Sequence, residues 1–453
     1  MKIVVGGASS VGKSIVGYLS LGNNDIVVVD EDASKLEEIS KEYDVQPFLG
    51  SISRPDVQES IGMKNMDMLI AVTDSDEVNM VACQVAYTLF NVPRKIARVD
   101  SQYFLNPLWN TLYNEKSLPI DLVITPDVEI AKFILGLINL PGCSSVYPFL
   151  NNTVNIFAFR LSDTEIPFMK FSVTHINQKL SELSAHISFI IRGNRRIFPS
   201  DEVYLQRNDI IYISCFSRQN MEILRLFGVD HNPYEKVIMF GANIISYYLA
   251  CRFEENDGIG SCIVESNPDI AAKMAEKLGS TRVISGDIMS SVILQEAGFS
   301  TADVSLAITD KDKDNLLLSF LAAKNKDTQA ISLVNSNDYN ALGFSLKDNV
   351  TIDRAVITIS SILQYLRKTR IREAYAIGRD MGEIWEIRLG EDSINLDKTV
   401  AELDIPDTST VITISHADEL IYDFTQYRLQ AEDKILIYVS PNNIREIESI
   451  FYL

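Results

Sequence analysis

The feature that most constrains this chain is an internal repeat with a period of about 235 residues. Residues 2–8, KIVVGGA, align with residues 236–242, KVIMFGA, so that Gly7 pairs with Gly241. Further along, residues 71–79, AVTDSDEVN, align with residues 307–315, AITDKDKDN. Several such matches in the same order indicate that the chain contains two copies of one unit.

Inside the first copy, the apolar pattern is that of alternating strands and helices. Buried strands are predicted near residues 2–6, 26–29, 46–49, 67–72 and 95–98, and a helix near 10–20. Strands that alternate with helices form a parallel, doubly wound sheet. We therefore expect two Rossmann-like α/β domains.

A last strand at 121–125 and a helix at 127–137 complete the first copy. This helix has a broad apolar stripe at positions 130, 133, 134, 137 and 138. An apolar stripe of this width has to be buried against another apolar surface, and we expect a second subunit to provide that surface. Each copy then ends in shorter apolar runs, where residues 207–213 and 432–438 both place an acidic turn before a buried strand.

Charge and composition exclude several classes of protein. The chain has 453 residues and a formal net charge of −20, which repels phosphate backbones and anionic lipids. The densest basic run is Arg367, Lys368, Arg370 and Arg372, and such a run is usually a solvated face. The most apolar window, 237–251, is shorter than the ~20 residues that cross a bilayer. We expect no nucleic-acid partner and no direct membrane insertion.

Targeting and redox signals favour a cytoplasmic protein. The strand pattern begins at Lys2, without the pattern of a secretion signal. The five cysteines are scattered and never spaced C-x-x-C, so neither a disulfide framework nor a zinc site is indicated.

The loop after the first strand has the spacing of a phosphate-binding loop. Gly7 to Gly12, GASSVG, follows a strand and opens a helix, where free backbone N–H groups hold a phosphate. Ser9 stands where the dinucleotide fingerprint has its second glycine. Asp30 ends the second strand at the distance expected for a carboxylate that binds ribose. A tight turn without a ligand, with Asp30 as a helix cap, is the alternative.

A rival interpretation extends the same loop to Lys13 and Ser14. G-x-x-x-x-G-K-[ST] is the phosphate loop of nucleoside triphosphatases. The dinucleotide interpretation is favoured because Asp30 is well placed, because the repeat keeps this acid as Glu265, and because the repeat has no Lys-Ser pair.

Three more residues belong to the expected ligand edge of the first copy. Thr73 and Asp74 follow the fourth strand, although Asp-Ser-Asp-Glu is equally a good helix start. Arg98 ends the fifth strand, where its guanidinium reaches either a phosphate or a carboxylate in an ion pair. In the second copy the loop residues are Gly241, Ala242, Asn243, Ile244 and Ile245, with Glu265 as the acid and Val334 in the place of Arg98. The loop of the second copy therefore has no glycine that corresponds to Gly12.

Together these motifs resemble the TrkA family, the tandem RCK regulators of bacterial Trk potassium transporters. The resemblance rests on Gly7 to Gly12, Val29-Asp30, Leu49-Gly50, the run from Ile70 to Cys83, and Lys95 to Arg98. It implies RCK N-terminal domains at 1–139 and 233–372 and small RCK C-terminal modules of the α+β class at 140–228 and 373–453.

The resemblance also implies a function. NAD(H) or an adenine nucleotide, ATP or ADP, binds at Gly7, Ala8, Ser9, Ser10, Val11, Gly12, Asp30, Thr73, Asp74 and Arg98. An assembly of RCK domains, expected to be a homotetrameric ring, then changes shape and controls a Trk-type potassium-translocating membrane subunit. The chain is expected to be a non-enzymatic, cytoplasmic subunit on the inner face of the membrane, without a metal site.

Two other classes remain open at this point. An NAD-dependent oxidoreductase needs a proton donor, and His175, His186, His231 and His416 all lie outside the expected ligand edge. A scaffold that has lost its ligand is compatible with Ser9 and with the weak second loop. Asp310, Asp312 and Asp314 alternate at a helix start, but they lack the glycine and distal glutamate of a calcium loop.

Overall fold

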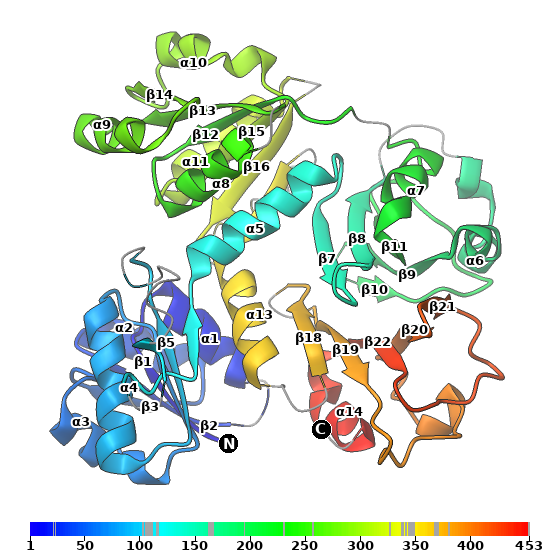
Figure 1. Ribbon diagram of the computed structural model, residues 1–453, viewed down its shortest axis with the longest axis horizontal. Coiled ribbons are helices and arrows are strands. Elements are labelled where there is room, and N and C mark those ends of the chain that lie inside the picture. Colours follow the sequence, from blue (N-terminus) through cyan, green and yellow to red (C-terminus); the bar gives the residue numbers. More distant parts are fainter. Residues whose placement is uncertain are drawn as a thin grey trace.

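The computed structural model describes residues 1–20, 22, 24–101, 104, 112–114, 117–161, 167–193, 195–229, 232–255, 258–325, 328–336, 339, 342, 349–366, 371–378 and 381–451. His231 and three members of the basic run, Arg367, Lys368 and Arg370, lie outside these residues. The described residues form two parallel six-stranded sheets and two antiparallel five-stranded sheets (Figure 1).

The first parallel sheet has the order β3-β2-β1-β4-β5-β6. Its strands are β1 (Lys2–Gly6), β2 (Asp25–Asp30), β3 (Gln46–Leu49), β4 (Met68–Ala71), β5 (Arg94–Arg98) and β6 (Leu122–Ile124). Its helices are α1 (Ser10–Ser20), α2 (Ala33–Glu42), α3 (Pro55–Ser60), α4 (Asp76–Phe90) and α5 (Pro126–Asn139). The central strands β1 and β4 are almost entirely buried, because helices cover both faces of the sheet.

The second parallel sheet repeats this order as β14-β13-β12-β15-β16-β17. Its strands are β12 (Lys236–Phe240), β13 (Gly260–Glu265), β14 (Arg282–Ser285), β15 (Val304–Ala307), β16 (Gln329–Val334) and β17 (Asn349–Asp353). Its helices are α8 (Ile244–Glu255), α9 (Pro268–Lys277), α10 (Ser291–Ala297), α11 (Asp312–Ala322) and α13 (Arg354–Leu366). The predicted repeat of a Rossmann-like fold is confirmed.

An antiparallel module follows each parallel sheet. The first has the order β10-β9-β11-β8-β7 and contains β7 (Ser145–Phe149), β8 (Val154–Arg160), β9 (Ala185–Arg192), β10 (Arg195–Ile197), β11 (Ile210–Phe216), α6 (Val173–Leu180) and α7 (Asn220–Leu226). The second has the order β18-β19-β22-β20-β21 and contains β18 (Ile371–Ala376), β19 (Glu383–Arg388), β20 (Thr410–His416), β21 (Glu419–Ile421), β22 (Lys434–Val439) and α14 (Ile444–Phe451). The predicted limit between residues 372 and 373 falls inside β18.

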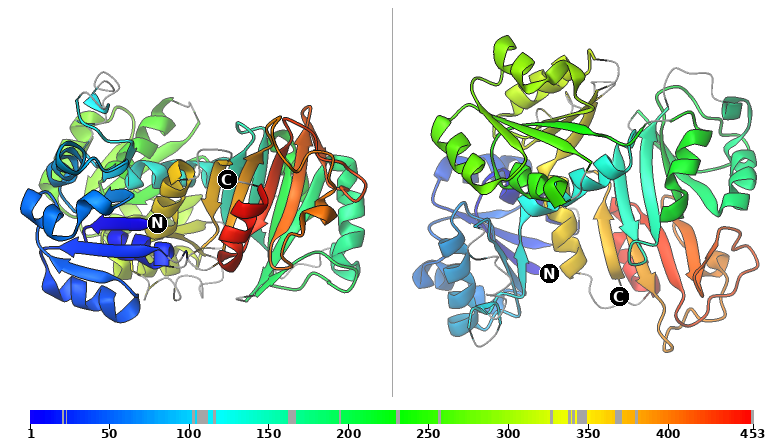
Figure 2. Two further views of the ribbon diagram at one scale, coloured as in Figure 1. Left: turned by 90° about the horizontal axis from the view of Figure 1, so that it is seen from below. Right: turned by 45° about the horizontal axis from the view of Figure 1, so that its top comes forward.

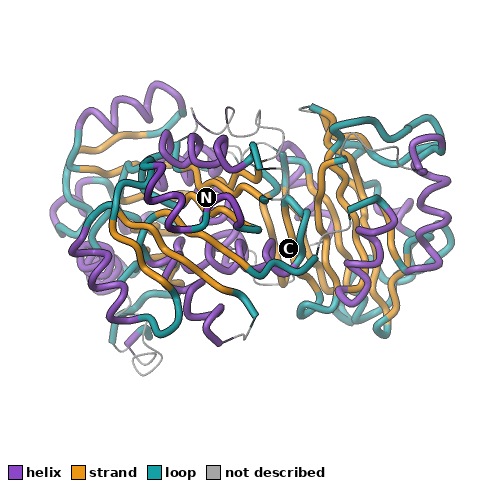
Figure 3. Tube along the Cα trace, turned by 90° about the horizontal axis from the view of Figure 1, so that it is seen from above, coloured by secondary structure: helices purple, strands orange, loops and turns teal. Residues whose placement is uncertain are grey.

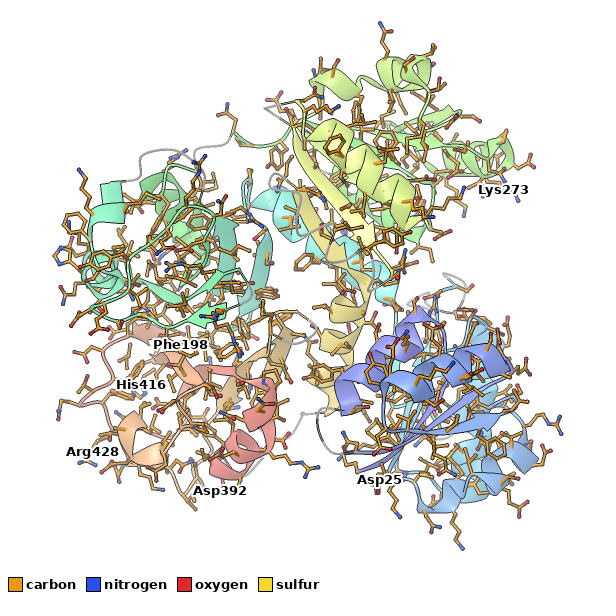
Figure 4. The ribbon with its side chains drawn as sticks, turned by 180° about the vertical axis from the view of Figure 1, so that it is seen from behind. Asp25, Phe198, Lys273, Asp392, His416 and Arg428 are labelled. Atoms are coloured by element: carbon orange, nitrogen blue, oxygen red, sulfur yellow. The ribbon has the colours of Figure 1, made fainter. Side chains whose placement is uncertain are left out.

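The two antiparallel sheets stack against each other at one end of the molecule (Figures 2 and 3). One apolar cluster includes residues of both sheets, with Phe189 of the first in contact with Tyr438 of the second. Phe198, labelled in Figure 4, also packs on the Tyr438 ring. Tyr422 of the second module donates to the backbone of Ser214 in the first, at 2.9 Å.

The last helix of each parallel domain packs on the other copy of the repeat. Helix α5 lies against α8, and α13 lies against α1 (Figure 1). Ile134 of α5 belongs to the core that contains Leu249, and Ile362 of α13 belongs to the core that contains Ile15. The apolar stripe of α5 is therefore covered within the same chain. Our expectation that a second subunit covers it was wrong, because the internal repeat takes that place.

Candidate nucleotide site

The crevice between β1 and β4 is the topological switch point of the first parallel sheet. Strand order reverses there, and in open α/β sheets ligands bind outside the carboxyl ends of the strands at this point. The loop after β1 forms one side of the crevice and the segment after β4 forms the other. The loop, Asp30, Thr73, Asp74 and Arg98 all lie at these carboxyl ends.

Gly7 and Gly12 are required by the backbone itself. Gly7 has a φ of +109°, and a Cβ there would lie 2.8 Å from the backbone N of Thr73. A Cβ at Gly12 would lie 1.9 Å from the carbonyl oxygen of Gly7. Side chains are therefore excluded where the loop turns from β1 into α1. This packing brings the N-terminus of α1 to the crevice, where helix N–H groups attract an anion.

Asp30 joins the end of β2 to the glycine loop. Its Oδ2 accepts a hydrogen bond from Ala8 N at 2.6 Å, and its Oδ1 accepts one from Asp32 N at 2.8 Å. The carboxylate thus stands beside the loop, at the place where a Rossmann-like domain holds a ribose. Asp30 does not cap the following helix, because Asp32 does so through Ser34 N.

Asn79 holds the far side of the crevice together. Its side chain is fully buried; Oδ1 accepts from Thr73 N at 2.9 Å and from Thr73 Oγ1 at 2.7 Å. Its Nδ2 donates to Thr73 O and to Arg98 O, both at 3.0 Å. Asn79 was missed as a site residue, although the repeat contained the signal, since 71–79 and 307–315 both end in asparagine.

Arg98 is held by two acids at the same edge. Its Nη2 lies 2.5 Å from Asp100 Oδ2, and its Nη1 lies 3.4 Å from Asp74 Oδ1. Burial lowers the pKa of Arg98, but Asp100, Asp74 and Asp127 more than offset this and raise it. Its Nε is buried and has no partner among the described residues. The side chain is thus a largely buried cation with one donor unused.

The second copy reproduces this frame with different side chains. Glu265 Oε2 accepts from Ala242 N at 2.8 Å, as Asp30 does from Ala8. Asn315 repeats the bonds of Asn79, with Thr309 O at 2.8 Å and Leu333 O at 3.0 Å. Leu333, and not Val334, therefore corresponds to Arg98. The assignment of Val334 was wrong by one residue, because the segment from Asn315 to Leu333, which contains the shorter helix α11, is one residue shorter than the segment from Asn79 to Arg98.

The loop from Gly241 to Ile245 is arranged differently from its counterpart. Asn243 Nδ2 donates to Ile308 O at 2.6 Å, and Ser246 N donates to Asn243 Oδ1 at 3.1 Å. Gly241 has a φ of +105°, close to that of Gly7. Ile244 and Ile245 begin α8, and Ile245 is buried in the core. The first glycine and the acid are thus retained, while the helix start is occupied by side chains of the loop itself.

The triphosphatase interpretation finds no support in the geometry. Lys13 Nζ lies 2.5 Å from Glu38 and 2.8 Å from Glu42 on α2. Ser14 Oγ donates to Ser10 O at 2.7 Å within the helix. Neither group is aimed at a phosphate in the loop.

Other predicted residues are distant or otherwise engaged. The described histidines lie in the antiparallel modules: His175 in α6, His186 in β9 and His416 in β20. His416 is labelled in Figure 4. Asp312 accepts from the backbone N–H groups of Asn335 and Ser336 at 2.9 and 2.8 Å. Within the described residues, no group of three or more His, Cys, Asp or Glu side chains is placed to hold a metal ion.

Two pockets lined by described residues lie away from the crevice between β1 and β4. One of about 320 Å³ opens over the start of α11, with Lys311, Lys313 and Asn335 in its lining. Another, of about 520 Å³, lies at the joint of the antiparallel modules, between Arg218 and Lys434.

In the described part of the chain, no helix has the length and apolar character needed to cross a membrane.

Comparison with known proteins agrees with this architecture. Residues 3–126 and 237–356 match the TrkA-N domain, and residues 384–452 match the TrkA-C domain. The chain is 30% identical to the Trk system potassium uptake protein TrkA of Azorhizobium caulinodans, over 100% of this chain and 98% of that protein. The GsuK RCK domain has a TM-score of 0.63 at 15% identity, over 99% of this chain and 94% of its own. The GsuK channel bound to NAD has a TM-score of 0.62 at 15% identity, over 99% of this chain and 78% of its own.

Proposed function

Because the chain belongs to the TrkA family of Trk-system potassium uptake proteins, we propose that it is the nucleotide-sensing regulatory subunit of such a system. In this proposal it works in the cytoplasm, at the inner face of the membrane. It controls a separate, membrane-embedded subunit that translocates potassium. The four predicted units, 1–139, 140–228, 233–372 and 373–453, are the proposed domains, except that the last one begins before β18, whose first residue is Ile371.

The observation that carries the proposal is the crevice of the first copy. The glycine loop and Asp30 form one side, tied by the Ala8 N–Asp30 Oδ2 hydrogen bond of 2.6 Å. Thr73 and Arg98 form the other side, tied by Asn79. Loop N–H groups suit a pyrophosphate and Asp30 suits a ribose diol. We propose NAD(H) or an adenine nucleotide, ATP or ADP, as the ligand, and NAD is the ligand named for the GsuK channel.

The proposed role is regulatory and not catalytic. A dehydrogenase needs an acid or base within hydrogen-bond reach of the substrate, and the described histidines lie in the antiparallel modules. A regulator needs only to bind its ligand unequally in two conformations. Since α5 and α13 each pack on the opposite copy, closure of one crevice also displaces a helix of the other domain.

Self-assembly is the second part of the proposal. Moving a population from about 1:99 to 99:1 takes about 5.5 kcal/mol of differential affinity, which several sites in one symmetric assembly supply jointly. Val81 on α4 and Leu317 on α11 occupy equivalent positions, and each is 48% exposed. We propose that these two apolar faces join copies of the chain into a homotetrameric ring of RCK domains.

Thermal melting with NAD, NADH, ATP and ADP tests the ligand. Binding to the folded state alone stabilises it by about 2.7 kcal/mol at a ligand concentration of 100 Kd. We expect at least one nucleotide to raise the melting temperature of the wild type and to lose this effect in Asp30→Asn. Glu265→Gln is the matched control, because Glu265 makes the same pair of backbone bonds in the second copy.

Transport measurements test the regulatory role. Potassium uptake by a Trk-type membrane subunit in vesicles is expected to respond to the stabilising nucleotide only when the wild-type chain is added. A chain that binds no nucleotide in the melting experiment would be a scaffold, and one that binds without any effect on uptake would not be a regulator of this transporter.

A further inference from the structure

In the second copy, one side chain spans the crevice at the switch point. Asn243 lies in the loop after β12, and its Nδ2 donates to the carbonyl oxygen of Ile308 at 2.6 Å. Ile308 directly follows β15. The hydrogen bond therefore joins the two sides of the crevice between β12 and β15, where a dinucleotide must pass in a sheet of this order.

The same side chain occupies the start of helix α8. Asn243 Oδ1 accepts from Ser246 N at 3.1 Å, and Ser246 Oγ accepts from Asn243 N at 2.9 Å. These reciprocal bonds satisfy N–H groups that a helix start otherwise offers to a phosphate. An incoming pyrophosphate has to break both bonds before it reaches the same donors.

The described residues of the first copy form no such closure. Ser9 corresponds to Asn243, and its Oγ is buried without a partner among the described residues. Gly12 corresponds to Ser246, and a Cβ at Gly12 would lie 1.9 Å from Gly7 O. Since Ser246 carries a Cβ, the second loop cannot follow the backbone path of the first. Gly241 is accordingly less tightly packed than Gly7, because a Cβ at Gly241 would lie 3.3 Å from Thr309.

From these contacts we propose that Asn243 excludes pyrophosphate-bearing nucleotides from the second copy, so that each chain holds a single site of this kind, in the first copy. The inference rests on the proposed nucleotide binding and assigns its stoichiometry. Leu333 stands in the place of Arg98, so the cation that Arg98 supplies is missing from that edge of the second copy, and this also disfavours an anionic nucleotide there.

Titration calorimetry of the full chain with NADH tests this assignment. The wild type is expected to bind one NADH per chain. Asn243→Ser combined with Ser246→Gly gives the second loop the residues of Ser9 and Gly12, and this rebuilt chain is expected to bind two. Adding Glu265→Gln to that variant is expected to return it to one. Ser9→Asn, which transfers the closure to the first copy, is expected to weaken binding at least tenfold.

Each outcome decides the point. Two NADH per wild-type chain overturns the inference and leaves the proposed function intact. One NADH in both the wild type and the rebuilt chain also overturns it. No binding of NADH by the wild type removes NADH from the proposed ligands, and the melting experiment with ATP and ADP then decides the proposed function. The variant with Asn243→Ser and Ser246→Gly decides the present inference alone: binding of NADH supports the closure by Asn243, and no binding overturns it. If the rebuilt chain fails to fold by circular dichroism, Asn243→Ser alone is judged by the same criteria.

Discussion

Arg354 and Asp127 form an ion pair between the first turns of α13 and α5, which belong to different copies of the repeat. Their side chains are only 12% and 18% exposed. Arg354 also donates through Nε to Asn335 Oδ1 at 2.6 Å, at the ligand edge of the second copy. Asp127 contributes to the raised pKa values of Arg98 and Asp100, at the ligand edge of the first. The pair thus lies between the two crevices.

Removal of either partner of this pair is expected to destabilise the chain. Arg354→Met leaves Asp127 partly buried near Asp100, and Asp127→Ala leaves a partly buried cation. We expect each change to lower the free energy of unfolding by about 1–3 kcal/mol. In a double-mutant cycle measured by urea denaturation, the double variant should lose clearly less than the sum of the two. Strictly additive losses would show that the two residues do not interact.

Gly12→Ala is expected to disrupt the first parallel domain. The new Cβ would meet a backbone oxygen, which cannot rotate away as a flexible side chain can. We expect a loss of more than about 3 kcal/mol, seen as insoluble protein or a strongly lowered melting temperature. Gly258→Ala is the control, because a Cβ there meets nothing within 4 Å. Equal melting temperatures for the two variants would contradict the close packing at Gly12.

Substitution of the two buried asparagines, Asn79 and Asn315, should distinguish an effect on stability from an effect on nucleotide binding. Asn79→Ala and Asn315→Ala each remove four hydrogen bonds between a carboxamide and its surroundings. Each variant is expected to lose about 2–4 kcal/mol of stability, since buried backbone groups lose their partners. Only Asn79→Ala should also weaken NADH binding, because in our proposal only the first copy binds the nucleotide. Equal weakening in both variants would argue against that asymmetry.

Glu383 is expected to make the stability of the chain fall as the pH rises. It is fully buried in β19, and burial raises its pKa to about 8, although a hydrogen bond from Trp385 acts in the opposite direction. Between its ordinary value of 4.5 and about 8, the folded state keeps a proton that the unfolded state releases. Stability is therefore greatest below pH 4.5 with respect to this group and is lost as the pH approaches 8.

The range from pH 6.5 to 8 is the cleanest window for this measurement. Burial lowers the pKa of His186 to about 4, so His186 adds a dependence of opposite sign below its ordinary value of 6.5. Glu383→Gln is expected to reduce the fall in melting temperature between pH 6.5 and 8. A variant whose melting temperature falls as steeply as that of the wild type would show that Glu383 does not titrate there.

The apolar faces of α4 and α11 are expected to hold the assembly together. Val81→Asp and Leu317→Asp place a charge in the proposed interface, where burial is costly. Light scattering should show a smaller assembly for each variant than for the wild type. Val292→Asp on α10 is the control, since Val292 is 69% exposed and lies outside these faces. A wild-type chain that remains a monomer would refute the proposed ring.

Much of the fold was predictable because its signals are local. The run 68–71 is apolar throughout and could only be a central strand. Because the chain contains a repeat, each strand or helix predicted in the first copy was also predicted in the second. Asp30 was placed beside the glycine loop from spacing alone, since the carboxyl ends of adjacent parallel strands meet at one edge. The role of Asn79 required a third element, β5, whose carbonyl receives its second N–H group. Hydrogen bonds of this kind join residues far apart in the chain and leave no periodic pattern.

The sequence by itself therefore determined the class of fold, the order of the units and the sheet edge at which we propose a ligand, because apolar periodicity and glycine spacing act within one element. Only the tertiary structure decided which surfaces meet. Helix α5 is covered by α8 of the same chain, and Asn243 reaches across to Ile308. Both contacts depend on how separate elements pack, and packing depends on shape and distance in three dimensions, to which the linear order of residues gives no direct access.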